Sequence, residues 1–250
     1  MSVIAVIPAR IGSERLSRKP LQLLAGRPLI EWVWKRVVQF KSADHVCVAT
    51  DSDEVAGICY AFGADVELTS ADHKSGTERV AEVAARHPEF DVVVNVQGDE
   101  PFVAEEHVTE SVRMVRAGFD VGTVGIPIGS LEDWYNPAAV KIAMGSNNRA
   151  LYFSRAPIPH QRDGNPSAAD LVSDQYLRHI GVYAYSSAAL ARWVALPPVS
   201  LENSEKLEQL RPLSAGMTFG VAVVSELSVG VDTAEDLAEA ERRLLKTMEK

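Results

Sequence analysis

Short apolar runs alternate with longer amphipathic segments along the whole chain. The runs, such as VIAVI at 3–7 and VVVNVQ at 92–97, are rich in β-branched residues and have the length of buried strands. The segments between them repeat apolar residues at helical spacing. This alternation is typical of an α/β fold, in which a mostly parallel central sheet is flanked by helices.

The pattern predicts nine strands and seven helices. The strands are Val3–Ile7, His45–Thr50, Val66–Leu68, Val92–Gln97, Val121–Ile128, Val140–Met144, Ala150–Phe153, His179–Tyr185 and Phe219–Val224. The helices are Leu29–Phe40, Ser52–Phe62, Thr77–Arg86, Ala104–Ala117, Ser186–Ala195, Ser204–Ala215 and Thr233–Glu249. The segment 157–176 has no period and is rich in Pro, Asp, Ser and Gly, so we expect a long loop or flap there.

Composition narrows the class of protein. The 250 residues are enough to bury a core without disulfides, and Cys47 and Cys59 have no second pair or His cluster that would indicate zinc. No run approaches the ~20 apolar residues of a membrane span, so we expect a cytoplasmic protein with no membrane partner. A net charge of −9 argues against nucleic-acid binding. An anionic ligand would therefore need a local cationic pocket.

Such a pocket is predicted directly after the first strand, in IPARIGSERLSRKP at 7–20. This stretch gathers four cations with only Glu14 to offset them: Arg10, Arg15, Arg18 and Lys19. Ligands of parallel α/β folds bind at the carboxyl ends of strands, and Gly12 and Ser13 let the backbone approach an anion closely. The stretch is neither a P-loop nor a GxGxxG motif. Its alternative interpretation is a solvated basic turn, which the position after the first strand disfavours.

Two aspartates are candidates for holding a cation. Asp99 follows the strand in VVVNVQGDEP and would face a bound triphosphate, although an Asp there can also cap the following turn. Asp232, in VGVDTAEDL, reads equally well as part of an ordinary helix N-cap. The sequence pattern by itself does not single out Asp232.

Three further polar stretches offer groups for a base and a sugar. DHKSGTER at 72–79 places small residues before a helix, where they can meet a base edge or simply cap the helix, with Thr77 at the N-cap. RHIGVYAY at 178–185 contains His179, which is more often a satisfied sheet histidine than a ligand. LENSEKLEQLR at 201–211 reads as a solvated helix face or as a source of sugar contacts.

Taken together, these motifs resemble a known family. IPARIGSERLSRKPL followed by GRPLIEWVWKR resembles the opening of sugar nucleotidyltransferases. DHKSGTERVAE, VVVNVQGDEPFV, YLRHIGVYAY, LENSEKLEQLR and VGVDTAEDL then follow in the order found in the 3-deoxy-manno-octulosonate (Kdo) cytidylyltransferases. The resemblance covers essentially the whole chain.

The resemblance implies an activity and an architecture. Members of the family transfer a cytidylyl group from CTP to the anomeric hydroxyl of Kdo, an acidic sugar, giving CMP-Kdo and pyrophosphate for lipopolysaccharide biosynthesis. A Rossmann-like nucleotidyltransferase domain over 1–250 is implied, in which 130–200 carry a small antiparallel extension for sugar binding and dimerisation. A homodimer and Mg²⁺ as cofactor are implied as well.

The resemblance also assigns roles to individual residues. Catalytic roles fall on Arg10, Arg15, Lys19, Asp99 and Asp232, of which Asp99 and Asp232 are the metal ligands. Nucleotide binding falls on Ala9, Gly12, Ser13, Ser75, Gly76, Thr77 and Gln97. Sugar binding falls on Arg79, His179, Tyr183, Glu208 and Gln209.

Two alternative functions remain open at this point. The first is a cytidylyltransferase for a related acidic sugar, such as 8-amino-Kdo or a sialic-acid-like molecule. The second is a nucleotide-binding regulator that has lost catalysis, against which the intact Asp99, Asp232 and cation set argue.

Overall fold

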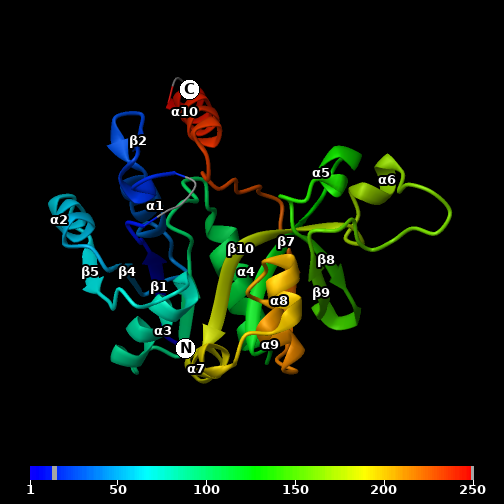
Figure 1. The fold of residues 1–250 in the computed structure, drawn as a ribbon, viewed down its shortest axis with the longest axis horizontal. Coiled ribbons are helices and arrows are strands. Elements are labelled where there is room, and N and C mark those ends of the chain that lie inside the picture. Colours follow the sequence, from blue (N-terminus) through cyan, green and yellow to red (C-terminus); the bar gives the residue numbers. More distant parts are fainter. Residues whose placement is uncertain (13–15, 249–250) are drawn as a thin grey trace. The chain divides into compact units, whose positions relative to one another are not determined.

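The chain folds into two compact units. The structure, a computed structural model, describes residues 1–12 and 16–248. One unit consists of Met1–Glu105 together with Leu227–Lys250, and the other of Glu106–Glu226. The elements of both are labelled in Figure 1. The single-domain organisation expected from the sequence stays a prediction.

The first unit is built on four parallel strands in the order β6-β1-β4-β5. Residues 3–7 of β1 are fully buried or nearly so, as its unbroken apolar run requires of a central strand. Because all four strands run the same way, their carboxyl ends lie at one edge of the sheet. The strands are β1 (Val3–Pro8), β4 (His45–Thr50), β5 (Asp65–Leu68) and β6 (Val92–Asn95).

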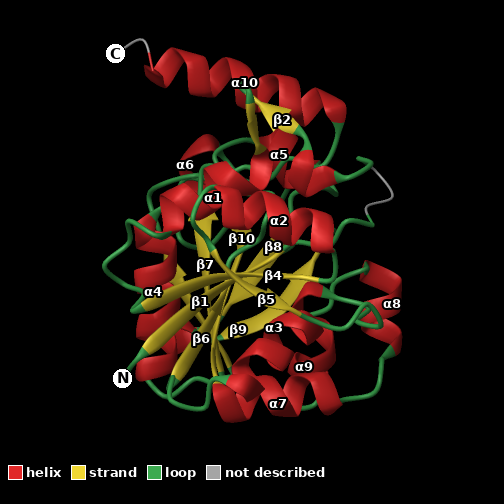
Figure 2. Cartoon of the chain, turned by 90° about the vertical axis from the view of Figure 1, so that its left-hand side faces the viewer, coloured by secondary structure: helices red, strands yellow, loops and turns green. Residues whose placement is uncertain are grey.

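Helices of the first unit alternate with these strands. They are η1 (Lys19–Leu21), α1 (Leu29–Val37), α2 (Asp53–Ala61), α3 (Gly76–Arg86) and α10 (Ala234–Met248). A small hairpin of β2 (Leu23–Leu24) and β3 (Arg27–Pro28) lies beside α10, far apart from it in sequence (Figure 2). Leu24, Leu29 and Ala240 share one apolar cluster. This cluster fixes α10 to the first unit.

The second unit combines parallel and antiparallel pairs. Strand β7 (Val121–Pro127) pairs parallel to β11 (Phe219–Val223) and antiparallel to β10 (Leu177–Ser186). β8 (Lys141–Met144) joins β10 and β9 (Ala150–Ser154) in antiparallel fashion. The remaining elements are α4 (Glu105–Arg116), α5 (Leu131–Tyr135), η2 (Ser146–Asn148), α6 (Ala168–Leu171), α7 (Ser187–Ala195), α8 (Ser200–Glu205) and α9 (Leu210–Ser214).

The predicted fold class is confirmed: a mostly parallel sheet flanked by helices, with a small antiparallel addition. The predicted helix Ser204–Ala215 is wrong, because Lys206 adopts a left-handed conformation (φ 52°) that ends α8 before α9 begins. The predicted loop 157–176 contains one short helix, α6, which Ser167 and Asp170 cap reciprocally. The hairpin, η1, η2 and α5 were not predicted.

None of the helices within residues 1–12 and 16–248 combines the length and the apolar character that a bilayer crossing requires.

Gly122 of β7 gives a test of how tightly the second unit is packed. A Cβ at this position would lie 1.9 Å from the carbonyl oxygen of Ser111 in α4, so the helix backbone would have to move. We expect Gly122→Ala to lower the free energy of unfolding by about 3 kcal/mol. The matched control is Gly57→Ala in α2, where a Cβ meets nothing within 4 Å and the helix should gain up to about 1 kcal/mol. Urea denaturation measures both, and equal stabilities would contradict the packing described.

Candidate functional site

Three segments that are distant in sequence meet at Lys19. Its ammonium Nζ donates to Asp99 Oδ2 at 2.6 Å and to Asp232 Oδ1 at 2.7 Å. Lys19 opens η1, Asp99 follows the carboxyl end of β6, and Asp232 precedes α10. The cluster therefore lies at the edge of the sheet where parallel α/β folds bind their ligands.

Asp232 is available to this cluster because its neighbours cap α10. Thr233 Oγ1 accepts from the Asp236 amide at 3.1 Å, and Asp236 Oδ2 accepts from the amides of Asp232 and Thr233 at 3.0 and 2.9 Å. The amide of Val231 donates to the carbonyl oxygen of Asp99 at 2.8 Å, which joins the two segments. The capping role that the sequence left open for Asp232 thus falls to Thr233 and Asp236.

The two carboxylates favour the charged form of Lys19. Burial lowers the pKa of Lys19, but the Asp99 and Asp232 carboxylates outweigh it and hold that pKa above its usual value. The Lys19 side chain is only 15% exposed. Lys19 is therefore charged at neutral pH, and two carboxylate oxygens converge on one positive centre.

This donor set suits a hard divalent cation. Carboxylate oxygens are the protein ligands that Mg²⁺ prefers, and one or two of them suffice when substrate phosphates supply the rest. In the described part of the chain, no group of three or more His, Cys, Asp or Glu side chains forms a closed metal cluster. Asp99 and Asp232 therefore fit a metal that is shared with a ligand.

Glycine at position 98 is needed for this arrangement, although the sequence motif did not single it out. A Cβ on Gly98 would lie 2.6 Å from the carbonyl oxygen of Pro8. The chain can thus pass closely over the end of β1 only with glycine there. Beside it, Gln97 Nε2 donates to Asn95 Oδ1 at 3.3 Å. The sequence signal for the close approach at Gly98 was its position in QGD, between the end of the strand and Asp99.

The other residues of the cationic stretch differ in their surroundings. Arg10 and Gly12 are exposed, while Arg18 pairs with Glu54 at the surface. The backbone of Ala9 bonds to the end of β4, donating to Ala49 and accepting from Thr50 Oγ1. Ser13 and Arg15, predicted to bind the nucleotide and its phosphates, lie outside the described residues.

The start of α3 follows the predicted motif with one correction. Ser75, rather than Thr77, is the N-cap, and its hydroxyl accepts from the amide of Glu78 at 3.2 Å. Thr77 is buried. A Cβ on Gly76 would come within 3.3 Å of the Pro8 ring, so the helix begins close to the end of β1.

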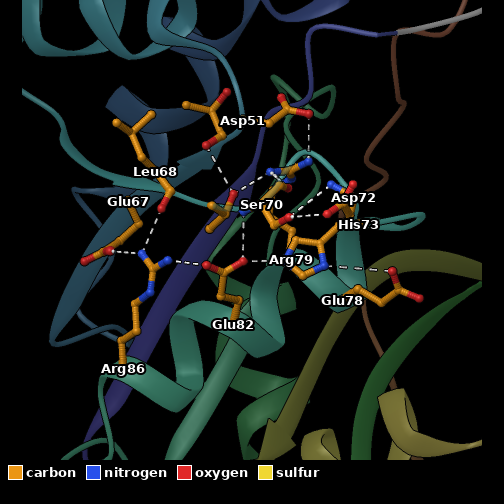
Figure 3. Close-up of polar contacts among 12 residues, drawn as sticks. Asp51, Glu67, Leu68, Ser70, Asp72, His73, Glu78, Arg79, Glu82 and Arg86 are labelled. Carbon is orange, nitrogen blue, oxygen red and sulfur yellow. Dashed lines mark hydrogen bonds and ion pairs between the residues drawn. The ribbon is translucent and has the colours of Figure 1, made fainter.

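Arg79, predicted to bind sugar, is only 2% exposed. Its guanidinium donates to Asp51 Oδ2 at 3.0 Å, to the carbonyl oxygen of Ser70 at 3.3 Å and to Thr69 Oγ1 (Figure 3). These contacts tie α3 to the segments that follow β4 and β5. In the structure, Arg79 therefore joins α3 to these two segments.

His179 lies in β10 of the second unit, next to a bulge between Ile180 and Tyr183. Thr123 Oγ1 donates to the Val182 carbonyl oxygen at 2.8 Å and lies 2.9 Å from His179 Nε2. A hydroxyl has one proton to give, so Nε2 carries the proton and donates to Thr123. The Tyr183 ring lies 5.2 Å from the imidazole.

His179 is neutral at physiological pH. Desolvation lowers the pKa of its imidazole from 6.5 to about 3, although part of the residue remains accessible. A neutral imidazole suits a hydrogen bond with a hydroxyl better than an ion pair with a carboxylate. The chemistry that His179 can offer a sugar is therefore polar but uncharged.

Glu208 and Gln209 lie in the turn between α8 and α9. Gln209 is 5% exposed and Glu208 is half-buried. Nearby, Arg211 binds both carboxylate oxygens of Glu202, at 2.8 and 2.5 Å. This bidentate pair holds the two short helices together where a single helix had been predicted.

Lys141 is a buried cation that sequence reasoning missed. Its Nζ donates to the carbonyl oxygens of Asn136, Ala139 and Arg155 at 2.8, 2.6 and 2.6 Å. Burial and the neighbouring Arg155 lower the pKa of this ammonium to about 8. Its place in the strand KIAM gave no signal of this role, because a lysine in such a strand usually points to solvent.

A family model and two relatives of similar sequence all carry the name cytidylyltransferase. A family model described as cytidylyltransferase matches residues 4–219. A relative from Gemmatimonas aurantiaca, named 3-deoxy-manno-octulosonate cytidylyltransferase, is 49% identical over 244 residues, covering 96% of this chain and 93% of its own. A protein of the same name from Yersinia enterocolitica is 46% identical over 243 residues, covering 95% and 96%.

Solved structures of similar fold include an enzyme of the same kind. The chain is similar to CMP:2-keto-3-deoxy-manno-octonic acid synthetase complexed with CTP, with a TM-score of 0.90, 36% identity and coverage of 99% of this chain and 100% of that one. A 4-diphosphocytidyl-2C-methyl-D-erythritol synthase from Anaerococcus prevotii, at 17% identity and a TM-score of 0.62, has the same fold.

The pKa of His179 predicts how stability depends on pH. Its folded-state pKa of about 3 lies below the unfolded value of 6.5, so the unfolded chain binds more protons between these two pH values. Acidification from pH 6.5 should therefore destabilise the wild type by about 1.4 kcal/mol per pH unit from this group alone. His179→Asn should lack this component. Urea denaturation from pH 7 to pH 4 compares the two slopes, and parallel slopes would show that His179 is not desolvated.

Proposed function

We propose that this chain, which belongs to the cytidylyltransferase family, transfers a cytidylyl group from CTP to the anomeric hydroxyl of Kdo. The products are CMP-Kdo and pyrophosphate. The observation that carries the proposal is the Lys19, Asp99 and Asp232 cluster at the carboxyl end of β6, in a chain of this family. The similarity to a synthetase complexed with CTP supports CTP as the nucleotide.

The reaction requires in-line positioning and neutralisation of charge rather than a covalent nucleophile. Arg10, Arg15 and Lys19 would bind phosphate oxygens and stabilise the charge that grows on the α-phosphate and the leaving pyrophosphate. The assignment of Arg15 rests on the sequence motif. Lys19 would exchange its carboxylate partners for phosphate oxygens when the substrate binds.

A divalent metal, which we propose is Mg²⁺, would be held by Asp99 and Asp232. When bound, it would supply Lewis-acid neutralisation of the triphosphate. The partial exposure of the two carboxylates, 27% for Asp99 and 37% for Asp232, supports access for such an ion.

The remaining assignments divide between the two units. Ala9, Gly12, Ser13, Ser75, Gly76, Thr77 and Gln97 of the first unit would bind the nucleotide. His179, Tyr183, Glu208 and Gln209 of the second unit are the proposed sugar contacts, with His179 serving a sugar hydroxyl. Arg79, also assigned to the sugar, would act through the segments it joins. A homodimer located in the cytoplasm completes the proposal.

Pyrophosphate release measured with CTP and a panel of sugar acids tests the function. We expect turnover with Kdo, and none with a sugar acid lacking the 3-deoxy-2-ulosonate group. Preference for 8-amino-Kdo or a sialic-acid-like sugar would replace the proposed substrate. CTP binding without turnover of any sugar acid would instead indicate a regulator.

Asp99→Asn tests the metal-ligand assignment, because it keeps the shape of the side chain and removes its charge. We expect turnover to fall about 100-fold or more, the scale of losing one strong electrostatic contact. Asp65→Asn, at an exposed carboxylate that begins β5, is the control and should retain full activity. Turnover of Asp99→Asn within a factor of about three of the wild type would make a metal-ligand role untenable.

Variants of Lys19 and its neighbour Arg18 distinguish a phosphate-binding site from a surface that is only basic. Lys19→Met should lower kcat/KM for CTP by about 100-fold or more, because a desolvated phosphate contact is worth far more than a surface ion pair. Arg18→Met removes a cation from the same stretch but only a surface pair with Glu54, and should change kcat/KM less than threefold. A thermal melt checks that both variants fold. Equal effects would indicate that the stretch acts only through its overall charge.

A further inference from the structure

The segment 70–75, which leads into α3, is anchored by one carboxylate. Glu82 Oε2 accepts from the backbone amide of Ser70 at 3.0 Å and lies 2.5 Å from His73 Nε2 (Figure 3). These two contacts grip the segment at its first residue and at its middle. Glu82 is on the second turn of α3, so a helix side chain reaches back to hold the segment that precedes the helix.

Other side chains of α3 also form hydrogen bonds with the segment 70–75. Glu78 Oε2 accepts from the amide of Lys74 at 2.7 Å, and Arg79 donates to the carbonyl oxygen of Ser70 at 3.3 Å. The Ser75 hydroxyl caps the helix through the amide of Glu78. Side chains of α3 therefore hold the segment 70–75 at Ser70, His73 and Lys74.

Glu82, like Glu78, has no part in the proposed chemistry, but its carboxylate contacts the segment at two points, Ser70 and His73. Burial raises the pKa of its carboxyl, but the Ser70 amide, His73 and Arg86 outweigh that effect and lower the pKa overall. Its ion pair with Arg86 lies at the surface, where such pairs stabilise little. The distinctive contribution of Glu82 is thus to the segment 70–75.

We propose that Glu82 is a positioning residue for the nucleotide. By fixing 70–75, it holds the groups of Ser75, Gly76 and Thr77 in the conformation that binds the base, so that this ordering does not have to occur on binding. The inference rests on the proposed function, which assigns these three residues to the nucleotide.

Arg86→Ala is a matched control for Glu82→Ala. Both variants lose the Glu82–Arg86 ion pair, and Arg86→Ala additionally loses contacts to Glu67 and the Leu68 carbonyl at β5. Only Glu82→Ala loses the bonds to Ser70 and His73. Glu82→Gln, which keeps an acceptor oxygen and the side-chain length, should recover part of the lost function.

Two measurements test the proposal. In nucleotide-free protein, we expect amide hydrogen exchange of 70–75 to be about tenfold faster in Glu82→Ala than in Arg86→Ala or the wild type. In the kinetic assay, we expect KM for CTP to rise about tenfold in Glu82→Ala, with kcat changed less than threefold and KM for the sugar unchanged. A thermal melt accompanies each variant, and if Glu82→Ala fails to fold, Glu82→Gln carries both comparisons.

Exchange or KM for CTP in Glu82→Ala equal to that of Arg86→Ala would overturn the proposal, as would a loss confined to kcat. These outcomes in an active wild type leave the proposed function standing. If the wild type turns over no sugar acid, calorimetric binding of CTP replaces KM. Weaker binding by Glu82→Ala then supports the positioning role while the proposed function fails, and no binding by the wild type overturns both.

Discussion

The ammonium of Lys19 between Asp99 and Asp232 is the interaction on which the proposed site depends. Two partly buried carboxylates that face one another repel unless a cation lies between them. The lysine supplies that cation, and in doing so joins the stretch after β1, the end of β6 and the start of α10. In the proposed reaction, a substrate that brings a metal and phosphates would replace each of these contacts with one of the same sign.

Contacts elsewhere in the first unit position the segments that meet at this junction. Gly98 lets the segment after β6 pass over Pro8, and the Thr233–Asp236 cap leaves Asp232 to face Lys19. The side chains of α3 fix the neighbouring segment 70–75 through charge-assisted hydrogen bonds. A buried charge needs polar partners, and in the second unit three carbonyl oxygens supply them to the ammonium of Lys141.

The sequence predicted those features that depend on local pattern. The apolar runs gave β1, β4 and β6 nearly to their ends, and the cationic stretch and Asp99 follow strand ends where ligand groups are expected. The start of the helix was predicted, but its N-cap was placed at Thr77 instead of Ser75, because only the backbone conformation decides where the helix begins.

Features that depend on the tertiary structure escaped prediction. The break between α8 and α9 rests on a left-handed Lys206, a residue type that seldom adopts that conformation. Arg79 is paired with Asp51, which lies 28 residues away in the sequence. The ammonium of Lys141 is bound by carbonyl oxygens from two separate loops, at Asn136 and Arg155. Asp232 was ambiguous because its own neighbours form a helix cap.

Crystallography of the protein with CTP and Mn²⁺, using the anomalous signal of manganese, tests the central claim most directly. We expect a manganese peak bound by the Asp99 and Asp232 carboxylates, with Lys19 Nζ moved from them to a phosphate oxygen. A complex in which CTP is bound, the manganese lies elsewhere and Lys19 still bridges both aspartates would contradict it.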